Sequence, residues 1–302
     1  MKQVSAVPPA RLPGLLKSPG IHLAIGPFVV HIQSAIPGVA EGIALFYSDS
    51  EINETPDFAD FHVALIRPMG LRRWYRPQVQ FALDGYLPFK PLPCDQAFPM
   101  FEWCLNWCIS NHMHQYLIIH AAVVEKDGYA VILPGAPGSG KSTLCASLAL
   151  SGWRLLTDEL ALVSLDGCTV TPLPRPVSLK NESIEVIRRF SPGVTIGKTA
   201  SDTVKGTVAH MKAPADSVQR SVELAQPAWV IMPRYEVNAE TQLERNTRAS
   251  TLMTLAELSF NYSLLGRQGF EALATLVDAS ECFTLTYSEL GEAIRTIEGL
   301  AD

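Results

Sequence analysis

The spacing of apolar and polar positions changes along the chain. In the first hundred residues, short apolar runs at 21–24, 28–32, 61–66 and 79–83 have the period of β-strands and are separated by Gly- and Pro-containing turns. Positions 39–46 fit either a strand or a short helix. The Pro-rich residues 1–20 fit an irregular arm. The pattern predicts a small β-rich N-terminal domain, which we place at residues 1–112.

Longer periodic segments follow. Residues 97–115 carry apolar side chains at helical spacing and predict a linking helix. Residues 116–126 predict one strand, which a turn at Asp127-Gly128 joins to a second strand at 129–133. Further on, the pattern predicts strands at 153–157, 160–165, 207–211, 229–232 and 282–287, and helices at 182–190, 251–265, 269–277 and 288–300. This alternation predicts an α/β domain over residues 113–302.

A glycine-rich motif lies at the centre of this second domain. Residues Gly135–Ser142 fit G-x-x-x-x-G-K-[ST], between the apolar strand at 129–133 and a predicted helix at 141–151. Glycines allow backbone N–H groups to surround phosphate oxygens, and the helix N-terminus adds partial positive charge. We therefore expect a nucleoside triphosphate to be bound by Gly135, Ala136, Pro137, Gly138, Ser139, Gly140, Lys141, Ser142 and Thr143.

An acidic pair follows the P-loop helix. The apolar run at 153–157 leads directly into Asp158-Glu159, as in the Walker B arrangement, where a carboxylate faces Mg²⁺ and the γ-phosphate. We expect Lys141 to contact the β- and γ-phosphates, and we expect Ser142, Asp158 and Glu159 to hold the metal.

Composition limits the classes of partner. The chain has 302 residues, 47% of them hydrophobic, and a formal net charge of −6 without a basic run, which argues against nucleic acid. Its six cysteines form no zinc set and suit free thiols in a reducing cytosol. The longest apolar stretch is too short to span a bilayer, so we expect a soluble cytoplasmic protein without a membrane partner. A homo-oligomer is compatible with these properties.

In combination, the motifs resemble a known family. The run Ile119-His120-Ala121-Ala122, the P-loop and the acidic pair are similar to the catalytic domain of HPr kinase/phosphorylase, most closely to the HPr kinase-related kinases of bacteria. The resemblance covers roughly residues 115–300. It implies an α/β P-loop kinase domain related to phosphoenolpyruvate carboxykinase, preceded here by a different, β-rich N-terminal domain.

The resemblance also implies roles for single residues. Asp158 matches the carboxylate that accepts the proton of a serine, and His120 matches the histidine beside it. Arg248, in Asn246-Thr247-Arg248, weakly matches a phosphate-binding arginine, and Lys205 stands where the family has arginine. The implied catalytic set is therefore Asp158, His120, Lys141 and Arg248, with ATP and Mg²⁺ as cofactors.

Two positions depart from the family pattern. Glu159 replaces an aspartate, and Thr203 stands where a metal-binding glutamate is expected, with Asp202 beside it. These departures affect the second metal contact, and with it the phosphorylase reaction more than the kinase reaction.

For several of these residues, an ordinary structural role is the alternative to a functional one. Asp158 acts either as a base or only through the metal, and His120 is either catalytic or an ordinary core histidine. His210 reads as a core residue, Arg175 and Lys180 as solvated loop charges, and Trp103, Trp107 and Trp153 as core residues.

The sequence is compatible with three functions. The first is an ATP- and Mg-dependent kinase that phosphorylates a serine or threonine hydroxyl of a protein or peptide. The second is a nucleotide-binding regulatory module without transfer activity, and the third is a small-metabolite kinase.

Overall fold

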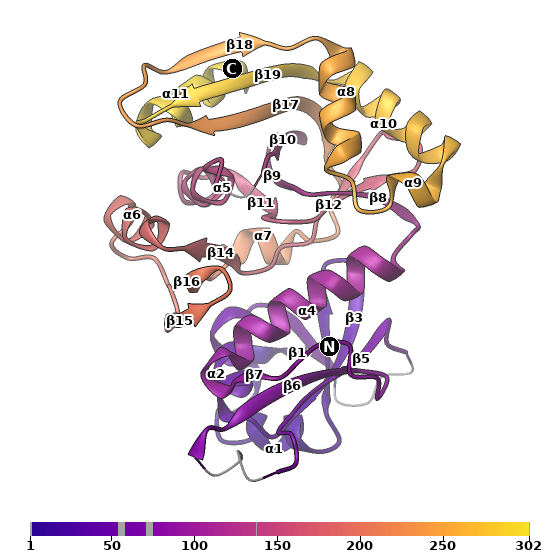
Figure 1. Ribbon diagram of the computed structural model, residues 1–302, viewed down its shortest axis with the longest axis vertical. Coiled ribbons are helices and arrows are strands. Elements are labelled where there is room, and N and C mark those ends of the chain that lie inside the picture. Colours follow the sequence, from indigo (N-terminus) through magenta and orange to yellow (C-terminus); the bar gives the residue numbers. More distant parts are fainter. Residues whose placement is uncertain (1, 54–57, 71–74, 137, 302) are drawn as a thin grey trace.

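The computed structural model describes residues 2–53, 58–70, 75–136 and 138–301, which form a mixed α/β protein with several sheets. Figure 1 shows two parts stacked along the long axis, with the N-terminal residues below and the P-loop half above. Helix α4 (Ala97–His112) lies between the two parts. Within the described residues, no helix is long and apolar enough to cross a bilayer.

The N-terminal part is built on a seven-stranded sheet with the order β1-β4-β2-β3-β5-β6-β7. Buried and partly exposed residues alternate along its strands, so one face is covered and the other is open. Between the parallel strands β3 and β5 the chain forms α2 and β4, whereas β2 and β3 form a hairpin. The strands are β1 (Lys2–Gln3), β2 (Ile21–Ile25), β3 (Phe28–Ser34), β4 (Glu51–Asn53), β5 (Phe61–Ile66), β6 (Gln78–Leu83) and β7 (Leu92–Pro93).

Helices cover the apolar face of this sheet. Residues 39–46, which fitted either a strand or a helix, belong to a helix that begins with a proline in its first turn. The expectation of an irregular arm over residues 1–20 is wrong, because Leu12 and Leu16 anchor a short helix in the core. The helical segments are η1 (Val4–Ala6), α1 (Leu12–Lys17), α2 (Pro37–Phe46), η2 (Cys94–Gln96) and α4.

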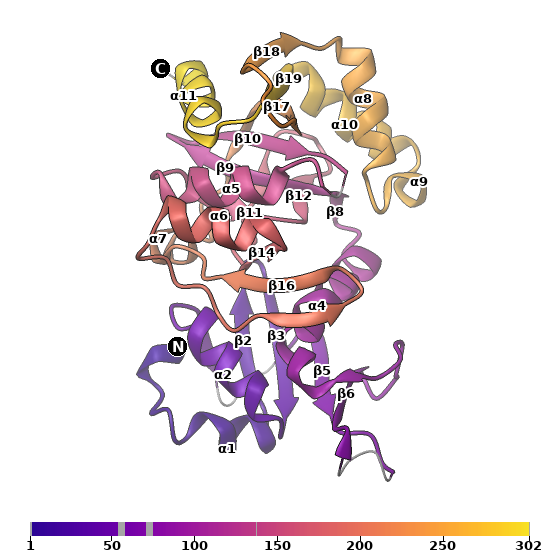
Figure 2. The same cartoon turned by 60° about the vertical axis from the view of Figure 1, so that its left-hand side comes forward.

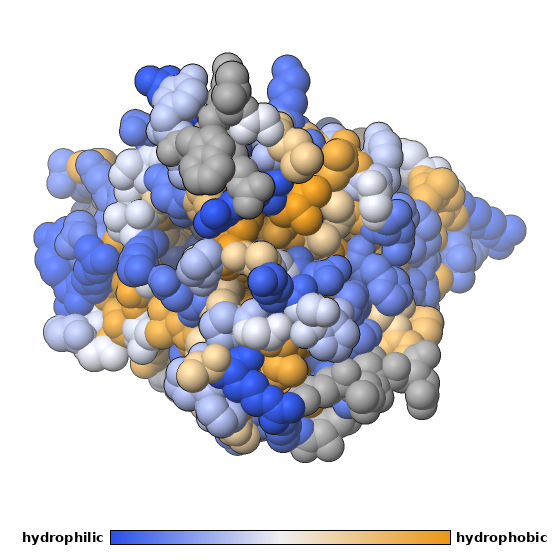
Figure 3. All heavy atoms as spheres, turned by 90° about the horizontal axis from the view of Figure 1, so that it is seen from below, coloured by the Kyte–Doolittle hydropathy of each residue, from blue (hydrophilic) through white to orange (hydrophobic). Residues whose placement is uncertain are grey.

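The core of the N-terminal part continues into the second half of the chain. Phe101 and Leu105 of α4 belong to the same buried cluster as Ile118, Leu162 and Leu173. The core therefore crosses the expected boundary after residue 112. Seen from its lower end, this part of the molecule shows separate apolar patches between hydrophilic side chains (Figure 3).

The P-loop half is organised by a six-stranded sheet with the order β11-β9-β10-β17-β19-β18. Strands β10, β17 and β19 are parallel to one another, and β11 points the same way because both β10 and β11 pair antiparallel with β9. The carboxyl ends of these four strands therefore meet at one edge of the sheet. The strands are β9 (Ala121–Lys126), β10 (Tyr129–Pro134), β11 (Arg154–Thr157), β17 (Gln226–Tyr235), β18 (Gln242–Arg245) and β19 (Glu281–Tyr287).

Helices pack on both faces of the central sheet, as Figure 2 shows from the side. Helices α5 and α11 share one buried cluster, whereas α8 and α10 share another with the opposite face. The helices are α5 (Lys141–Leu150), α6 (Glu182–Phe190), α7 (Ala215–Gln219), α8 (Arg248–Glu257), α9 (Tyr262–Leu265), α10 (Arg267–Ala279) and α11 (Leu290–Ala301).

Two small sheets complete this half. They have the orders β13-β12-β8 and β14-β16-β15. Their strands are β8 (Tyr116–Ile119), β12 (Ala161–Ser164), β13 (Val170–Thr171), β14 (Val177–Lys180), β15 (Ala200–Thr203) and β16 (Gly206–Met211).

Two expected elements are interrupted at the same place. The single strand expected over 116–126 is two strands in different sheets, and the helix expected over 251–265 breaks between α8 and α9. The cause is a pairing between these segments: the His120 amide donates to the Leu258 carbonyl at 2.8 Å, and the Phe260 amide donates to the Ile118 carbonyl at 2.9 Å.

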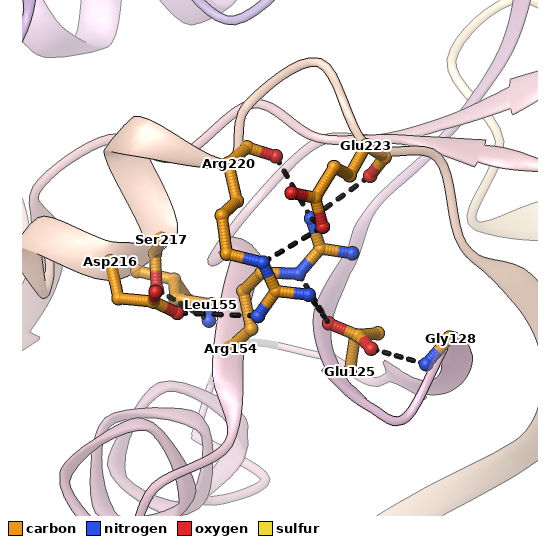
Figure 4. Close-up of polar contacts among 8 residues, drawn as sticks. All are labelled: Glu125, Gly128, Arg154, Leu155, Asp216, Ser217, Arg220 and Glu223. Carbon is orange, nitrogen blue, oxygen red and sulfur yellow. Dashed lines mark hydrogen bonds and ion pairs between the residues drawn. The ribbon is translucent and has the colours of Figure 1, made fainter.

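A buried polar network at the amino end of β11 links the central sheet to α7 and the residues after it (Figure 4). The Arg154 guanidinium pairs with Glu125 of the neighbouring strand and donates to the carbonyls of Arg220 and Glu223, both at 2.9 Å. The Ser217 hydroxyl accepts from the Leu155 amide at 2.9 Å. Because Arg154 and Glu125 are each other's partners in the interior, the network has a structural role.

Candidate functional site

The glycine loop lies where β10 ends and α5 begins. Gly138 and Gly140 have φ angles of +92° and +89°, in the left-handed region that favours glycine. A Cβ at Gly140 would lie 2.5 Å from the Tyr287 hydroxyl, and one at Gly135 would lie 2.5 Å from Oγ of Ser139. The tight backbone thus requires these glycines. Pro137, expected to be a member of the loop, lies outside the described residues.

Lys141 begins α5 and is buried, with 6% of its surface exposed. Its ammonium donates hydrogen bonds to the Gly135 carbonyl and to Nε2 of His120, both at 3.1 Å. An ammonium group has three donors, so one remains for a phosphate oxygen.

His120 lies at the break between β8 and β9, with its ring against Phe260 at a centroid distance of 5.8 Å. Burial, together with the charge of Lys141, lowers the pKa of His120 to about 4. The imidazole is therefore neutral near pH 7, which lets Nε2 accept the hydrogen bond from Lys141. The structure places His120 beside the lysine, and the side-chain hydrogen bond of its ring is with Lys141 rather than with Asp158.

Asp158 directly follows β11, at the same sheet edge as the glycine loop. Oδ2 accepts a hydrogen bond from the Ser178 amide at 3.0 Å. Oδ1 is buried and has no hydrogen-bond partner among the described residues. Burial and the neighbouring Glu159 carboxylate raise the pKa of Asp158 to about 6, against the opposing influence of Ser178, Lys141 and the Ser142 hydroxyl. Such a carboxyl group can exchange a proton near neutral pH.

Glu159 has a different environment. Burial alone would raise its pKa, but Lys205, Lys180 and Arg175 together hold it below the ordinary value. Its carboxylate accepts a hydrogen bond from the Asn106 amide of α4. The site thus contains two adjacent acids with opposite pKa shifts, a pattern typical of divided roles.

Arg175 is not a solvated loop charge, as the sequence had suggested, but a buried cation. Its guanidinium pairs with Glu102 of α4 at 2.7 Å and also donates to the side chain of Asn106. The Tyr47 hydroxyl donates to the other oxygen of Glu102 at 2.8 Å. A continuous chain of polar contacts therefore runs from Tyr47 in the N-terminal part to Glu159.

The structure does not bring Arg248 to this edge of the sheet. Arg248 pairs with Asp278 at 3.3 Å, beside the amino end of β19. Arg248 is the first residue of α8, whereas Phe260, which touches the ring of His120, comes after its last residue. A helix of this length spans about 15 Å, which separates Arg248 from His120. The expected phosphate contact of Arg248 is therefore not supported by its position.

Sequence reasoning missed the contribution of α4 to the site. Trp103 was expected to be a core residue and Asn106 was not singled out, although the ring of Trp103 lies 5.3 Å from the Lys205 ammonium. Lys205, by contrast, was singled out and does lie near Glu159. Contacts between residues so far apart in the chain leave no local pattern that would reveal them.

The residues fit a triphosphate and Mg²⁺. Open space lies beside Gly138 of the glycine loop, and the Ser142 hydroxyl lies near the Asp158 carboxylate, whose Oδ1 has no partner among the described residues. Within the described residues, no group of three or more His, Cys, Asp and Glu side chains forms a metal site by itself. Mg²⁺ typically takes only one or two protein ligands beside phosphates and water. ATP and Mg²⁺ stay predictions.

A comparison with protein families identifies the family of this chain. A family model described as ScmC: SynChlorMet cassette protein ScmC matches residues 96–260, more than half of the chain. The matched region begins directly before α4 and ends after α8. A comparison with curated proteins found no match.

Among solved structures, the Hpr(Ser) kinase/phosphatase from Coxiella burnetii matches with a TM-score of 0.27 and 12% sequence identity, over 61% of this chain and 93% of that chain. These values are too low to support an argument about activity. The similarity to HPr kinases therefore stays a prediction from the sequence motifs.

Proposed function

This chain belongs to the ScmC family of SynChlorMet cassette proteins, and we propose that it is a phosphotransferase that uses ATP and Mg²⁺. Its acceptor in this proposal is a serine or threonine hydroxyl of a protein or peptide. One observation carries the proposal: a single sheet edge gathers Lys141, Ser142 and the buried Asp158, whose Oδ1 has no partner among the described residues.

The loop amides and Lys141 are suited to bind and orient a triphosphate. In such a site the nucleotide supplies an activated phosphoryl group, and Mg²⁺ neutralises charge on its oxygens. Ser142 and Asp158 would hold the metal, and Lys141 would contribute charge to the phosphates. His120 fixes the direction of the lysine through its neutral Nε2.

Asp158 is suited to take the acceptor's proton. Its Oδ2 is held by the Ser178 amide, which leaves Oδ1 free to accept a hydrogen bond from an incoming hydroxyl. With a pKa of about 6, the carboxylate is ionised at pH 7 but is still basic enough to share a proton.

Glu159 is suited to organise cations rather than to exchange protons. Asn106 fixes its carboxylate, and Lys205 and Lys180 keep it ionised. These lysines would then supply positive charge near the phosphoryl group, where phosphoryl transfer depends on positioning and electrostatic stabilisation.

The test is a transfer assay with ATP labelled in its γ-phosphate, on protein extract and separately on a pool of small metabolites. Asp158→Asn is the matched control, because it keeps the size of the side chain. We expect the wild-type chain to transfer label to serine or threonine residues of a protein, and the variant to transfer far less label. Label in metabolites only would indicate a small-metabolite kinase. If the wild-type chain binds ATP but transfers no more phosphate than Asp158→Asn does, the protein would be a regulatory nucleotide-binding module.

A further inference from the structure

A small polar cavity lies between α4 and Asp158. Its volume is about 20 Å³, which exceeds the roughly 10–15 Å³ that one water-sized group requires. Five of the residues that line it each have a buried polar side-chain atom with no hydrogen-bond partner among the described residues. These atoms are Nε1 of Trp103, Oδ1 of Asp158, Nε of Arg175, Oγ of Ser178 and Nε2 of His210.

Such a concentration of unsatisfied groups is unusual in a protein interior. Asp158, Arg175, Ser178 and His210 are each less than 10% exposed, and a buried polar group without a partner costs about 1–3 kcal/mol. Several such groups in the residues that line one cavity indicate a binding site for a polar group.

The chemistry of the walls defines the occupant. Nε1 of Trp103 and Nε of Arg175 can only donate, whereas an ionised Asp158 can only accept. The complementary group accepts two hydrogen bonds and donates one, as a hydroxyl oxygen does. A phosphate or carboxylate would bring a second negative charge to Asp158, and an ammonium group has no lone pair for Trp103. Ser178 and a neutral His210 can adapt to either role.

Helix α4 supplies one wall through residues on a single face. Glu102, Trp103 and Asn106 are spaced to lie along the same side of the helix. Glu102 pairs with Arg175, and Asn106 donates a hydrogen bond to Glu159. This helix therefore fixes two other residues that line the cavity, Arg175 and Glu159. The Lys205 ammonium over the ring of Trp103 fixes the direction of the indole.

We propose that this cavity binds one hydroxyl oxygen, with the indole N–H of Trp103 as a donor to it and Asp158 as its acceptor. The inference rests on the proposed phosphotransferase function and adds the acceptor-binding group: α4 provides one wall of the pocket for the attacking hydroxyl. Both an alcohol and water offer this chemistry, so the test has an arm for each.

The first measurement requires no catalysis. The chain has five tryptophans, and Trp103→Phe removes one indole N–H signal from a ¹H–¹⁵N spectrum and thereby assigns it. A hydroxyl oxygen bridging Trp103 and Asp158 predicts that Asp158→Asn shifts the Trp103 signal. Trp153 is the matched control, because its Nε1 is also buried without a partner among the described residues and a lysine also lies over its ring. Its signal should not move.

The second measurement follows turnover of Mg·ATP by the full chain, as phosphate released to water and as methyl phosphate formed with added methanol. Trp103→Phe should lower turnover about tenfold and leave ATP affinity unchanged within twofold, whereas Trp153→Phe should leave both unchanged. A loss confined to methyl phosphate would assign the pocket to an alcohol. A loss confined to phosphate release would assign it to water.

Two outcomes separate this inference from the proposed function. If the Trp103 signal does not shift in Asp158→Asn, and the turnover of Trp103→Phe is within twofold of wild type, the inference is wrong. The proposed phosphotransferase function is not affected by this result. A wild-type chain that binds no Mg·ATP would overturn the proposed function, and the indole spectra alone would then decide whether the cavity holds a hydroxyl oxygen.

Discussion

The Lys141 ammonium donates a hydrogen bond across 3.1 Å to Nε2 of His120, which lies between β8 and β9 and directly precedes the neighbour of the P-loop strand. Because the pKa of His120 is lowered to about 4, the imidazole is a neutral acceptor throughout the physiological range. This relationship gives the histidine a role in positioning the P-loop lysine.

His120→Ala should therefore weaken binding of Mg·ATP. Lys141 loses one of its two acceptors, and a hydrogen bond contributes about 0.5–1.5 kcal/mol, so affinity should fall roughly two- to tenfold in calorimetry. His62→Ala, at an exposed position of the N-terminal sheet, is the control and should bind normally. An affinity of His120→Ala equal to that of wild type would show that the contact does not position the lysine.

Transfer should depend on pH through Asp158. With its pKa raised to about 6, the carboxyl is increasingly protonated below pH 6, and the rate should fall there and reach a plateau above about pH 7. Asp158→Asn should lose this limb and transfer 10²–10⁴-fold more slowly, which is the typical contribution of a general base. A variant with the same acid limb as wild type would assign the limb to another group.

The same pKa predicts an effect on stability. Between the ordinary pKa of 3.8 and the folded value of about 6, the native state binds more protons than the unfolded state. Stability therefore falls as pH rises through this window, and the loss persists above it. Asp158→Asn removes the charge and should raise the free energy of unfolding by about 1–3 kcal/mol at pH 8, with little change at pH 4.

Urea unfolding at the two pH values measures this difference. A destabilised Asp158→Asn at pH 8 would mean that Ser178, Lys141 and Ser142 stabilise the ionised carboxylate more than burial and Glu159 destabilise it, and the raised pKa of Asp158 would be wrong.

The buried pair between α4 and the site should be essential for stability. Arg175→Met leaves Glu102 charged and unpaired in the interior, which costs about 3–5 kcal/mol. The double variant Arg175→Met/Glu102→Gln should recover much of this loss, because it removes both charges. Arg188→Met, which breaks an exposed pair with Glu185, is the control and should change the free energy of unfolding by less than about 1 kcal/mol. A double variant no more stable than the single one would contradict the pairing.

The part of the site that the sequence predicted is the part built from local signals. The strand, glycine loop and helix around Lys141 follow from apolar spacing and from the conformational freedom of glycine, and Asp158 follows from the end of the next apolar strand. The β9–β10 hairpin follows from the turn at Asp127-Gly128. These elements depend on neighbours in the chain, and the structure contains them all.

The part that it did not predict depends on contacts between distant segments. The break at His120 exists because Leu258 and Phe260 pair with this strand, and no residue near His120 signals that pairing. Arg175 looked solvated because its partner, Glu102, is far away in sequence. Arg248 was placed by a weak linear match, which carries no information on the edge of the sheet that a residue reaches.

Calorimetry of Mg·ATP binding to the wild-type chain and to Lys141→Ala tests the phosphate-binding loop directly. The variant removes a charge-assisted contact worth roughly 1.5–3 kcal/mol, so we expect measurable binding by the wild type and an affinity at least about tenfold lower in the variant. Equal affinity of the two proteins, or no binding by the wild type, would contradict the assignment of Gly135–Ser142 as a phosphate-binding loop.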